Sequence, residues 1–297
     1  MEDTERIHKN INAECKEETI GKIEGISKET TNKETANKAS KEKTNKEEIS
    51  KEKTTNKTAN KTTSKKGIKS NKKARELTPE EKQKMQALQD LTLEVIERLK
   101  KEYPDAGCTL DYDQAWKLLV SVRLAAQCTD ARVNVVVEDL YAKYPDINAL
   151  AEADVEDIER IVRPCGLGKS KARDISACMK MLRDEYNGQI PKDFNAILKL
   201  PGVGRKSANL IMGDVFGEPA IVTDTHCIRL VNRIGLVDGI KEPKKVEMVL
   251  WKLVPPEEGS DFCHRLVYHG RDVCTARTKP YCHKCCLQDI CGKHGVE

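Results

Sequence analysis

Four cysteines close to the C-terminal end of the sequence have the spacing of a metal-binding loop. They are Cys274, Cys282, Cys285 and Cys291, separated by seven, two and five residues. Four thiolates can ligate one metal centre, and such a set suits zinc as well as an iron–sulfur cluster. The spacing alone does not decide between these two centres, and a disulfide pair is a third interpretation.

A glycine-rich turn at residues 201–204 has the character of an anion-binding site. One predicted helix ends at 198–200, Pro-Gly-Val-Gly forms the turn, and a second helix begins near Arg205. Gly202 and Gly204 let the backbone bend tightly and approach another surface closely. The free N–H groups at the start of the second helix then point at an anion, which the helix dipole favours. A DNA phosphate fits this role, because such contacts position a duplex without reading its sequence; an ordinary helix–helix turn is the alternative.

Length and composition indicate a soluble intracellular protein with one large domain or two modest ones. The 297 residues include 12 cysteines, yet no apolar N-terminal stretch resembles a signal peptide and no run of 18 apolar residues occurs. A reducing compartment follows, in which disulfides are not expected. The cysteines between positions 108 and 263 lie in apolar or helical contexts, as small buried hydrophobes do.

Residues 1–73 have the composition of a disordered segment. They contain no aromatic residue, and Thr-Asn-Lys recurs at positions 31, 44 and 55. So little apolar surface cannot offset the entropy of ordering. The segment holds 19 Lys and Arg against 13 Asp and Glu, which is a net charge of +6. The net charge of the whole chain is +4, so the remaining residues together carry −2. Its last part, 51–73, has nine Lys against one Glu, which favours either an arm for DNA phosphates or a solubilising tail.

The rest of the chain is patterned as an all-α protein. Residues 78–81 form a capping box, and the apolar positions after it recur at helical spacing until Tyr103-Pro104 ends the helix. Residues 114–126 are apolar nearly all round, as a central buried helix would be. Good strand patterns are absent, and we expect nine or ten helices. Seven residues precede later apolar patterns as candidate N-caps: Asp113, Asp130, Asp154, Ser170, Asp193, Asp224 and Asp261.

The stretch Leu-Pro-Gly-Val-Gly-Arg-Lys at 200–206 resembles the helix-hairpin-helix of the endonuclease III family. The resemblance extends through most of residues 80–297 and includes 124–130, 166–172, 222–226 and the cysteine-rich end. Each motif is moderately specific, but their order and separations together are highly specific. The resemblance implies a two-lobed helical fold, base-excision repair of damaged double-stranded DNA and a [4Fe–4S] cluster.

By this resemblance Lys206 and Asp224 are the catalytic residues. A neutral amine can attack C1′ of a deoxyribose, displace the damaged base and leave a Schiff base, after which β-elimination breaks the strand. A carboxylate nearby can stabilise positive charge on the sugar and move protons. The alternatives are a lysine that contacts a phosphate and a plain helix N-cap. We assign no catalytic role to His226, and we expect Lys169 and Lys171 to contact phosphate or solvent.

Two further residues match those that the family uses to flip a base out of the duplex and fill the gap. Gln127 can hydrogen-bond the orphaned partner base, and Leu167 can project an apolar wedge from its Gly-Leu-Gly turn. A hydrogen bond at a helix C-terminus and a buried loop leucine are the respective alternatives. In the hairpin, the DNA-binding residues are Gly202, Gly204 and Arg205.

The resemblance also assigns Cys274, Cys282, Cys285 and Cys291 to the [4Fe–4S] cluster. The family has six residues in the first gap and this chain has seven, which indicates one insertion. Cys286 is an extra thiol, either a spare ligand or a bystander. The cluster would fold the C-terminal loop, whose Arg271, Arg277 and Lys279 could then contact phosphates.

The expected architecture is a cluster lobe of residues 78–107 and 219–297 and a helical lobe of residues 108–218 that contains the hairpin. Lys206 and Asp224 would face the cleft between them. We expect a monomer without a membrane partner, located in the cytoplasm and bound to the nucleoid through DNA; a nuclear location stays open.

The expected reaction is removal of oxidised or otherwise damaged pyrimidines, followed by cleavage of the abasic site through Lys206. The related adenine glycosylases that act on mismatches are one alternative, but they lack the lysine at the start of the hairpin helix. A nonenzymatic helix-hairpin-helix DNA-binding module is the other. It requires neither an aligned lysine and aspartate nor a cluster.

Overall fold

The computed structural model describes residues 78–296, and every regular element within them is helical. Eleven are α-helices, against the nine or ten expected, and the shortest are α5 with six residues and α8 with four. None of the helices in this part of the chain has the length and apolar character of a membrane span. The predicted disorder of residues 1–73 lies outside the described residues. In chain order the elements are α2 (Pro79–Glu102), α3 (Ala115–Leu124), α4 (Asp130–Lys143), α5 (Ile147–Glu152), α6 (Val155–Val162), η1 (Arg163–Cys165), α7 (Gly168–Tyr186), α8 (Phe194–Ile197), α9 (Arg205–Asp214), α10 (Thr225–Ile234), α11 (Pro243–Leu250), η2 (Pro256–Glu258), α12 (Gly259–Asp272) and η3 (Cys282–Lys284).

Helix starts follow the capping rules only in part. The capping box at Thr78 is present, and Asp154, Asp193 and Asp224 each accept a backbone N–H as N-caps, as predicted. The other four predicted caps are wrong. The observed N-cap residues are Gln114 for α3, Thr129 for α4, Leu167 for α7 and Glu258 for α12. The first lies one residue after the predicted cap, and the others lie one to three residues before it.

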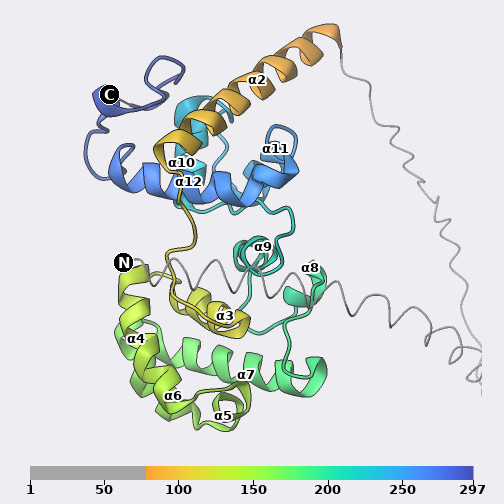
Figure 1. Ribbon diagram of the computed structural model, residues 1–297, viewed down its shortest axis with the longest axis vertical. Helices are drawn as coiled ribbons and strands as arrows, with labels where there is room; N and C mark the ends of the chain where they lie inside the picture. The colour runs from red at the N-terminus through yellow and green to blue at the C-terminus, as the bar shows by residue number, and fades with distance from the viewer. Residues whose placement is uncertain (1–77, 297) are drawn as a thin grey trace, which may run out of the picture. The chain divides into compact units, whose positions relative to one another are not determined.

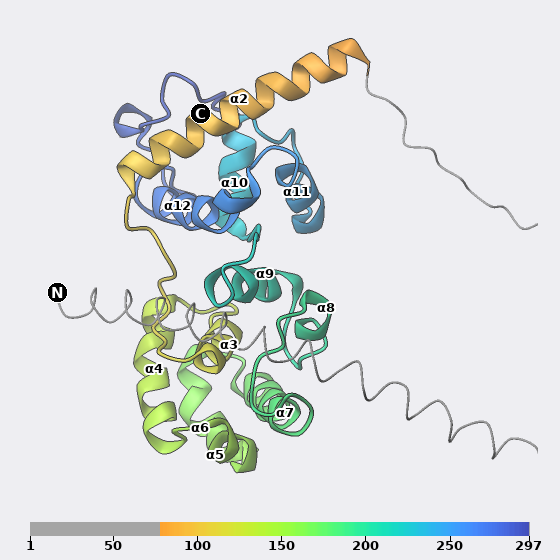
Figure 2. The same cartoon turned by 45° about the vertical axis from the view of Figure 1, so that its right-hand side comes forward.

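Buried hydrophobic side chains form two cores. The first core contains residues of α3 to α9, with Leu118 and Met179 among its fully buried members. The second core joins α2 to α10, α11, α12 and the C-terminal loop, and includes Val95 and Phe262. Figures 1 and 2 show these two groups of helices with α9 between them, and Leu210 of α9 packs against both cores. We keep the lobe boundaries given above as a proposal that the membership of the two cores supports.

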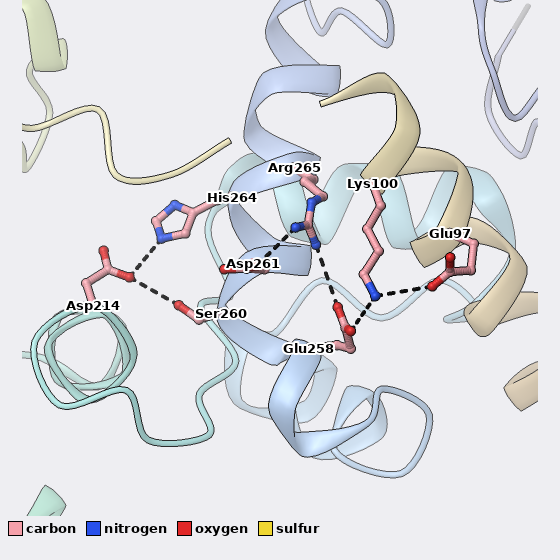
Figure 3. Close-up of polar contacts among 8 residues, drawn as sticks. All are labelled: Glu97, Lys100, Asp214, Glu258, Ser260, Asp261, His264 and Arg265. Carbon is pink, nitrogen blue, oxygen red and sulfur yellow. Dashed lines mark hydrogen bonds and ion pairs between the residues drawn. The ribbon is translucent and has the colours of Figure 1, made fainter. Parts of the chain in front are cut away.

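Charged side chains attach α2 to the C-terminal half of the chain. Lys100 of α2 pairs with Glu258 beside α12, and Arg265 of α12 approaches the same carboxylate at 3.7 Å (Figure 3). Two residues earlier in α2, Arg98 forms an ion pair with both carboxylate oxygens of Asp289 in the C-terminal loop. The described part of the chain therefore starts in the second core, crosses to the first after α2 and returns after α9 (Figure 1).

Candidate functional site

The turn between α8 and α9 approaches the helices beneath it very closely. Gly202 has φ +77°, and a Cβ there would lie 2.8 Å from the Cβ of Asp174 and 2.9 Å from the side chain of Arg123. Arg123 of α3 donates to Oδ2 of Asp174 of α7 from Nε at 2.8 Å and from Nη2 at 2.6 Å. Position 202 thus requires a glycine for both its backbone conformation and the space available, because the turn packs directly on the Arg123–Asp174 ion pair.

The start of α9 leaves backbone groups open to a ligand. Gly204 is the N-cap and supplies no side chain to the first N–H groups of the helix. It is exposed, and a Cβ built on it would meet nothing within 4 Å. Free N–H groups at an exposed helix start, aligned with the helix dipole, fit an anion such as a phosphate.

Arg205 holds this end of α9 against the second core. Its Nε and Nη2 donate to the two carboxylate oxygens of Glu247 on α11, at 2.6 and 2.7 Å. The Glu247 side chain is 2% exposed and also accepts from Nε1 of Trp251 at 3.3 Å. The Arg205 guanidinium is therefore paired within the protein, and its backbone N–H belongs to the open start of α9.

The other end of α9 is held by a second polar contact between the cores. Asp214 Oδ1 lies 2.8 Å from Nε2 of His264 and accepts from Oγ of Ser260 at 3.1 Å (Figure 3). Burial acts to lower the pKa of His264, but the hydrogen bond and charge of Asp214, with Asp261 and Asp224, raise it above 6.5. The packing is close here, since a Cβ on Gly213 would lie 2.4 Å from Oγ of Ser260.

Lys206 and Asp224 come from different helices and share one electrostatic neighbourhood. Lys206 is the second residue of α9 and is exposed. Asp224 is the N-cap of α10 and accepts from the backbone N–H of Cys227 at 2.7 Å, so the backbone fixes its carboxylate. Burial lowers the pKa of His226 below 6.5; Asp224 opposes this, while Arg229, Arg271 and Lys206 add to it. His226 is thus neutral at neutral pH and bonded to Arg229, as a structural residue would be.

The start of α4 reaches the same neighbourhood through Asp130. Burial acts to raise the pKa of Asp130, but hydrogen bonds from Thr109 and Arg271 and the charges of Arg271 and Lys206 hold it below 3.8. Arg271 of α12 donates to Asp130 at 2.6 Å. This guanidinium, which we expected at a phosphate, instead links the second core to the start of α4.

Gln127 and Leu167 project from loops in an unusual backbone conformation. Their φ values are +58° and +51°, in the left-handed region that a bulky residue such as leucine rarely adopts. Leu167 is 55% exposed, which argues against the buried loop leucine considered above. Gln127 is also exposed, and its side chain has no hydrogen bond to any of the described residues.

The four cysteines of the C-terminal loop line one cavity. Cys274, Cys282, Cys285 and Cys291 share it with mainly apolar side chains of α10, α12 and the loop. Three of the sulfurs accept N–H groups: Cys274 from Nη1 of Arg233 at 3.3 Å, and Cys285 and Cys291 from backbone N–H groups at 3.4 Å. No group of three or more described His, Cys, Asp or Glu side chains is arranged to hold a single metal ion.

All four cysteines line this cavity although seven residues separate the first two, and Cys286 is not among the lining residues. Hydrogen bonds to sulfur and an apolar wall are the surroundings that protein-bound iron–sulfur clusters have, so the residues present fit such a group.

Lys171 is the clearest departure from the sequence prediction. It is fully buried, whereas we expected phosphate or solvent around it. Lys171, Ile175 and Met179 are four residues apart on one face of α7, so the apolar period itself was the signal. The sequence prediction also missed Asp174, Glu247 and Asp214, whose roles depend on partners distant in the chain.

Comparison with known proteins identifies the family. Residues 120–256 match the family model of the HhH-GPD superfamily base excision DNA repair proteins. The endonuclease III of Synechocystis sp. is 42% identical over 209 residues, which cover 70% of this chain and 94% of that protein. The endonuclease III of Escherichia coli (strain K12) is 39% identical over 199 residues, 67% of this chain and 93% of that protein. The chain belongs to the endonuclease III family.

Solved structures agree with this membership. A non-covalent endonuclease III–DNA complex superposes with a TM-score of 0.66 at 38% identity, covering 69% of this chain and 95% of that one. A trapped covalent endonuclease III–DNA intermediate superposes with a TM-score of 0.65 at 38% identity, covering 73% and 97%. The helical fold of this chain is therefore that of the endonuclease III family.

The packing beneath the hairpin predicts a stability difference between two glycines. Gly202→Ala should lower the free energy of unfolding by about 1–3 kcal/mol, because its methyl group would overlap Asp174 and Arg123. Gly204→Ser, where space is open and a serine can cap α9, should cost nothing measurable. Urea unfolding followed by circular dichroism measures both. Equal stability of the two variants would contradict the prediction, because it would show that Arg123 and Asp174 shift to accommodate the methyl group at little cost.

The contact between Asp214 and His264 predicts a pH-dependent contribution to stability. Since the folded-state pKa of His264 is raised, this contribution is complete below about pH 6.5 and declines as the pH rises through the folded pKa. The difference in free energy of unfolding between wild type and His264→Gln should thus be largest in mild acid and shrink towards alkaline pH. Asp214→Asn should remove the same pH-dependent part. A difference that grows with pH would refute the assignment.

Proposed function

We propose that the protein excises damaged pyrimidines from double-stranded DNA and cleaves the abasic site, with Lys206 as nucleophile and Asp224 as its carboxylate partner. Membership of the endonuclease III family gives the reaction class, a base-excision DNA glycosylase and abasic-site lyase. The observation that supports the residue assignment is geometric: α9, which carries Lys206, is held at both ends, and the Asp224 carboxylate is fixed by the first turn of α10.

In the first step the neutral Nζ of Lys206 attacks C1′ of the damaged nucleotide. The N–C1′ bond forms, the glycosidic bond breaks, and the base leaves with its electron pair and takes up a proton. Opening of the sugar leaves a Schiff base between Lys206 and C1′. Loss of a proton from C2′ then expels the 3′ phosphate, and water finally hydrolyses the Schiff base to free the lysine.

Asp224 supports both stages by charge and by proton transfer. Positive charge grows on the sugar as the base departs, and a carboxylate fixed by the first turn of α10 stabilises it without having to reorganise. The same carboxylate can accept the proton that Lys206 must lose. The N-cap role and the catalytic role are therefore compatible, since the cap sets the position that catalysis needs.

Access to the base requires that the nucleotide leaves the stack. The exposed side chains of Gln127 and Leu167 are suited to fill the gap, Gln127 by hydrogen-bonding the orphaned base and Leu167 as a wedge. The backbone at Gly202, Gly204 and Arg205 anchors the phosphates beside the flipped nucleotide. Damage to pyrimidines rather than purines is part of the proposal. So are the monomeric state and the cytoplasmic location.

We assign the [4Fe–4S] cluster to Cys274, Cys282, Cys285 and Cys291, because all four line one cavity whose polar contacts point at sulfur. When bound, the cluster supplies iron–thiolate bonds that cross-link the C-terminal loop. Arg277 and Lys279, both exposed in that loop, are then free to meet phosphates, whereas Arg271 is paired with Asp130.

Borohydride trapping on a duplex with one abasic site tests the nucleophile. Wild type should form a covalent protein–DNA adduct, because borohydride reduces the Schiff base to a stable amine. Lys206→Gln should form none while its circular dichroism and iron content match wild type. No adduct from wild-type protein that holds its cluster would refute the lyase and favour a monofunctional glycosylase or a DNA-binding module.

Metal and sulfide analysis tests the cofactor. The purified protein should contain about four iron atoms and four acid-labile sulfides per chain. Cys282→Ser should lose most of both, and Cys286→Ser, the matched control one residue after a ligand, should retain them. One zinc per chain without sulfide would instead establish a zinc site.

A further inference from the structure

Lys171 lies at the centre of the polar contacts between α3, η1 and α7. Its side chain is 0% exposed, and its Nζ donates to the main-chain oxygen of Leu124 and to that of Cys165, both at 2.8 Å. Burial of an ammonium group costs several kcal/mol unless hydrogen bonds compensate. A lysine in this position therefore needs the two carbonyl groups, and it gives each of them a partner.

Each of these carbonyl groups belongs to the last residue of a helix, just before a loop that carries Gln127 or Leu167. Leu124 ends α3, and the chain reaches Gln127 three residues later; Cys165 ends η1, and the chain reaches Leu167 two residues later. The backbone N–H of Lys171 also donates to the main-chain oxygen of Leu167 at 3.0 Å. One residue of α7 thus contacts the roots of both loops and one of their tips.

The left-handed backbone of Gln127 and Leu167 must be stabilised by neighbouring groups. A left-handed backbone costs a non-glycine residue about 1–2 kcal/mol and persists only where its surroundings impose it. Gln127 and Leu167 are exposed, so packing of their own side chains cannot impose it. Hydrogen bonds at the first residues of the loops can impose this conformation. The two that do so, to the main-chain oxygens of Leu124 and Cys165, are both donated by Lys171.

We propose that Lys171 is a positioning residue that locks the Gln127 and Leu167 loops together, so that both side chains enter the DNA gap in one geometry. This inference rests on the proposed function, since the two side chains fill a gap only if the protein flips a base out. Lys171 itself does not touch the DNA, and its effect passes entirely through the two loops.

A double-mutant cycle on the holoenzyme separates positioning from general stability. The measurement is the single-turnover rate of excision of dihydrouracil, a saturated pyrimidine, from a duplex. Lys171→Met removes the donors and keeps a long unbranched side chain. It should slow excision about 10- to 100-fold, the cost of a misplaced group. In a Gln127→Ala/Leu167→Ala background, Lys171→Met should change the rate less than about twofold, because the side chains that it positions are gone.

Met179→Ala is the matched control, because Met179 is fully buried on the same helix, eight residues after Lys171. Whatever its effect on the rate, that effect should be the same in both backgrounds. A full Lys171→Met effect in both backgrounds would overturn the proposal and leave Lys171 a structural residue.

Failure of this inference and failure of the proposed function give different results. Wild-type protein without a borohydride adduct fails the proposed function. Wild-type excision rates in Gln127→Ala/Leu167→Ala refute the gap-filling roles and, with them, the role of Lys171. If Lys171→Met does not fold, Lys171→Arg, which keeps the charge and the donors in a larger head group, enters the same cycle. Its loss of rate must also vanish in the Gln127→Ala/Leu167→Ala background, and a loss that persists there overturns the proposal.

Discussion

The ion pair between Arg205 and Glu247 decides where the first turn of α9 lies, and the rest of the site depends on that position. Arg205 belongs to a helix of the first core, and Glu247 belongs to α11 in the second. At the far end of the same helix, Asp214 bonds His264 and Ser260 of α12. A ten-residue helix held at both ends can neither slide nor turn between the cores. Lys206 follows Arg205 directly, so its position relative to Asp224 is set before any ligand arrives.

Several of the groups that fix this geometry are charged and buried. Glu247 is 2% exposed, Asp214 is nearly as buried, and Lys171 is fully enclosed. A buried ion pair is rarely more stabilising than a well-packed apolar pair of the same size. Hydrogen bonds of defined direction, however, specify one arrangement of two elements, which apolar packing does less strictly. We therefore assign these residues to orientation: α9 between the cores, and the α3 and η1 loops against α7.

The exposed residues of the site differ from these buried groups, because their backbone is held by hydrogen bonds and packing while their outer side is open to a ligand. The hairpin rests on Arg123 and Asp174, while Gly204 faces open space. Leu167 is exposed in a left-handed conformation above the hydrogen bonds of Lys171. Loops that are already held in one conformation suit a DNA-binding surface, because binding then carries no further entropy cost for ordering them. The C-terminal loop follows the same principle, because N–H groups already face the sulfurs at its cavity.

The sequence by itself determined the features that depend on neighbours along the chain. Helical periodicity, the capping box at Thr78, the cap at Asp224 and the glycines of the hairpin all act over a few residues, and all are present in the structure. The order of the motifs was enough to indicate the family. The positions of Lys206, Asp224 and the four cysteines came from that resemblance, and their chemical roles remain proposals.

Only the tertiary structure decided which charged residues meet. Arg205 and Glu247 are 42 residues apart in the chain, and Lys171 and Leu124 are 47 apart. No local pattern encodes such a pairing, so the sequence indicated neither the partner of Arg205 nor the burial of Lys171, which was predicted to face solvent or phosphate. Local sequence sets backbone conformation because its hydrogen bonds are short-range. The partner of a buried charge is set by which helices pack together, and that is a property of the folded chain as a whole.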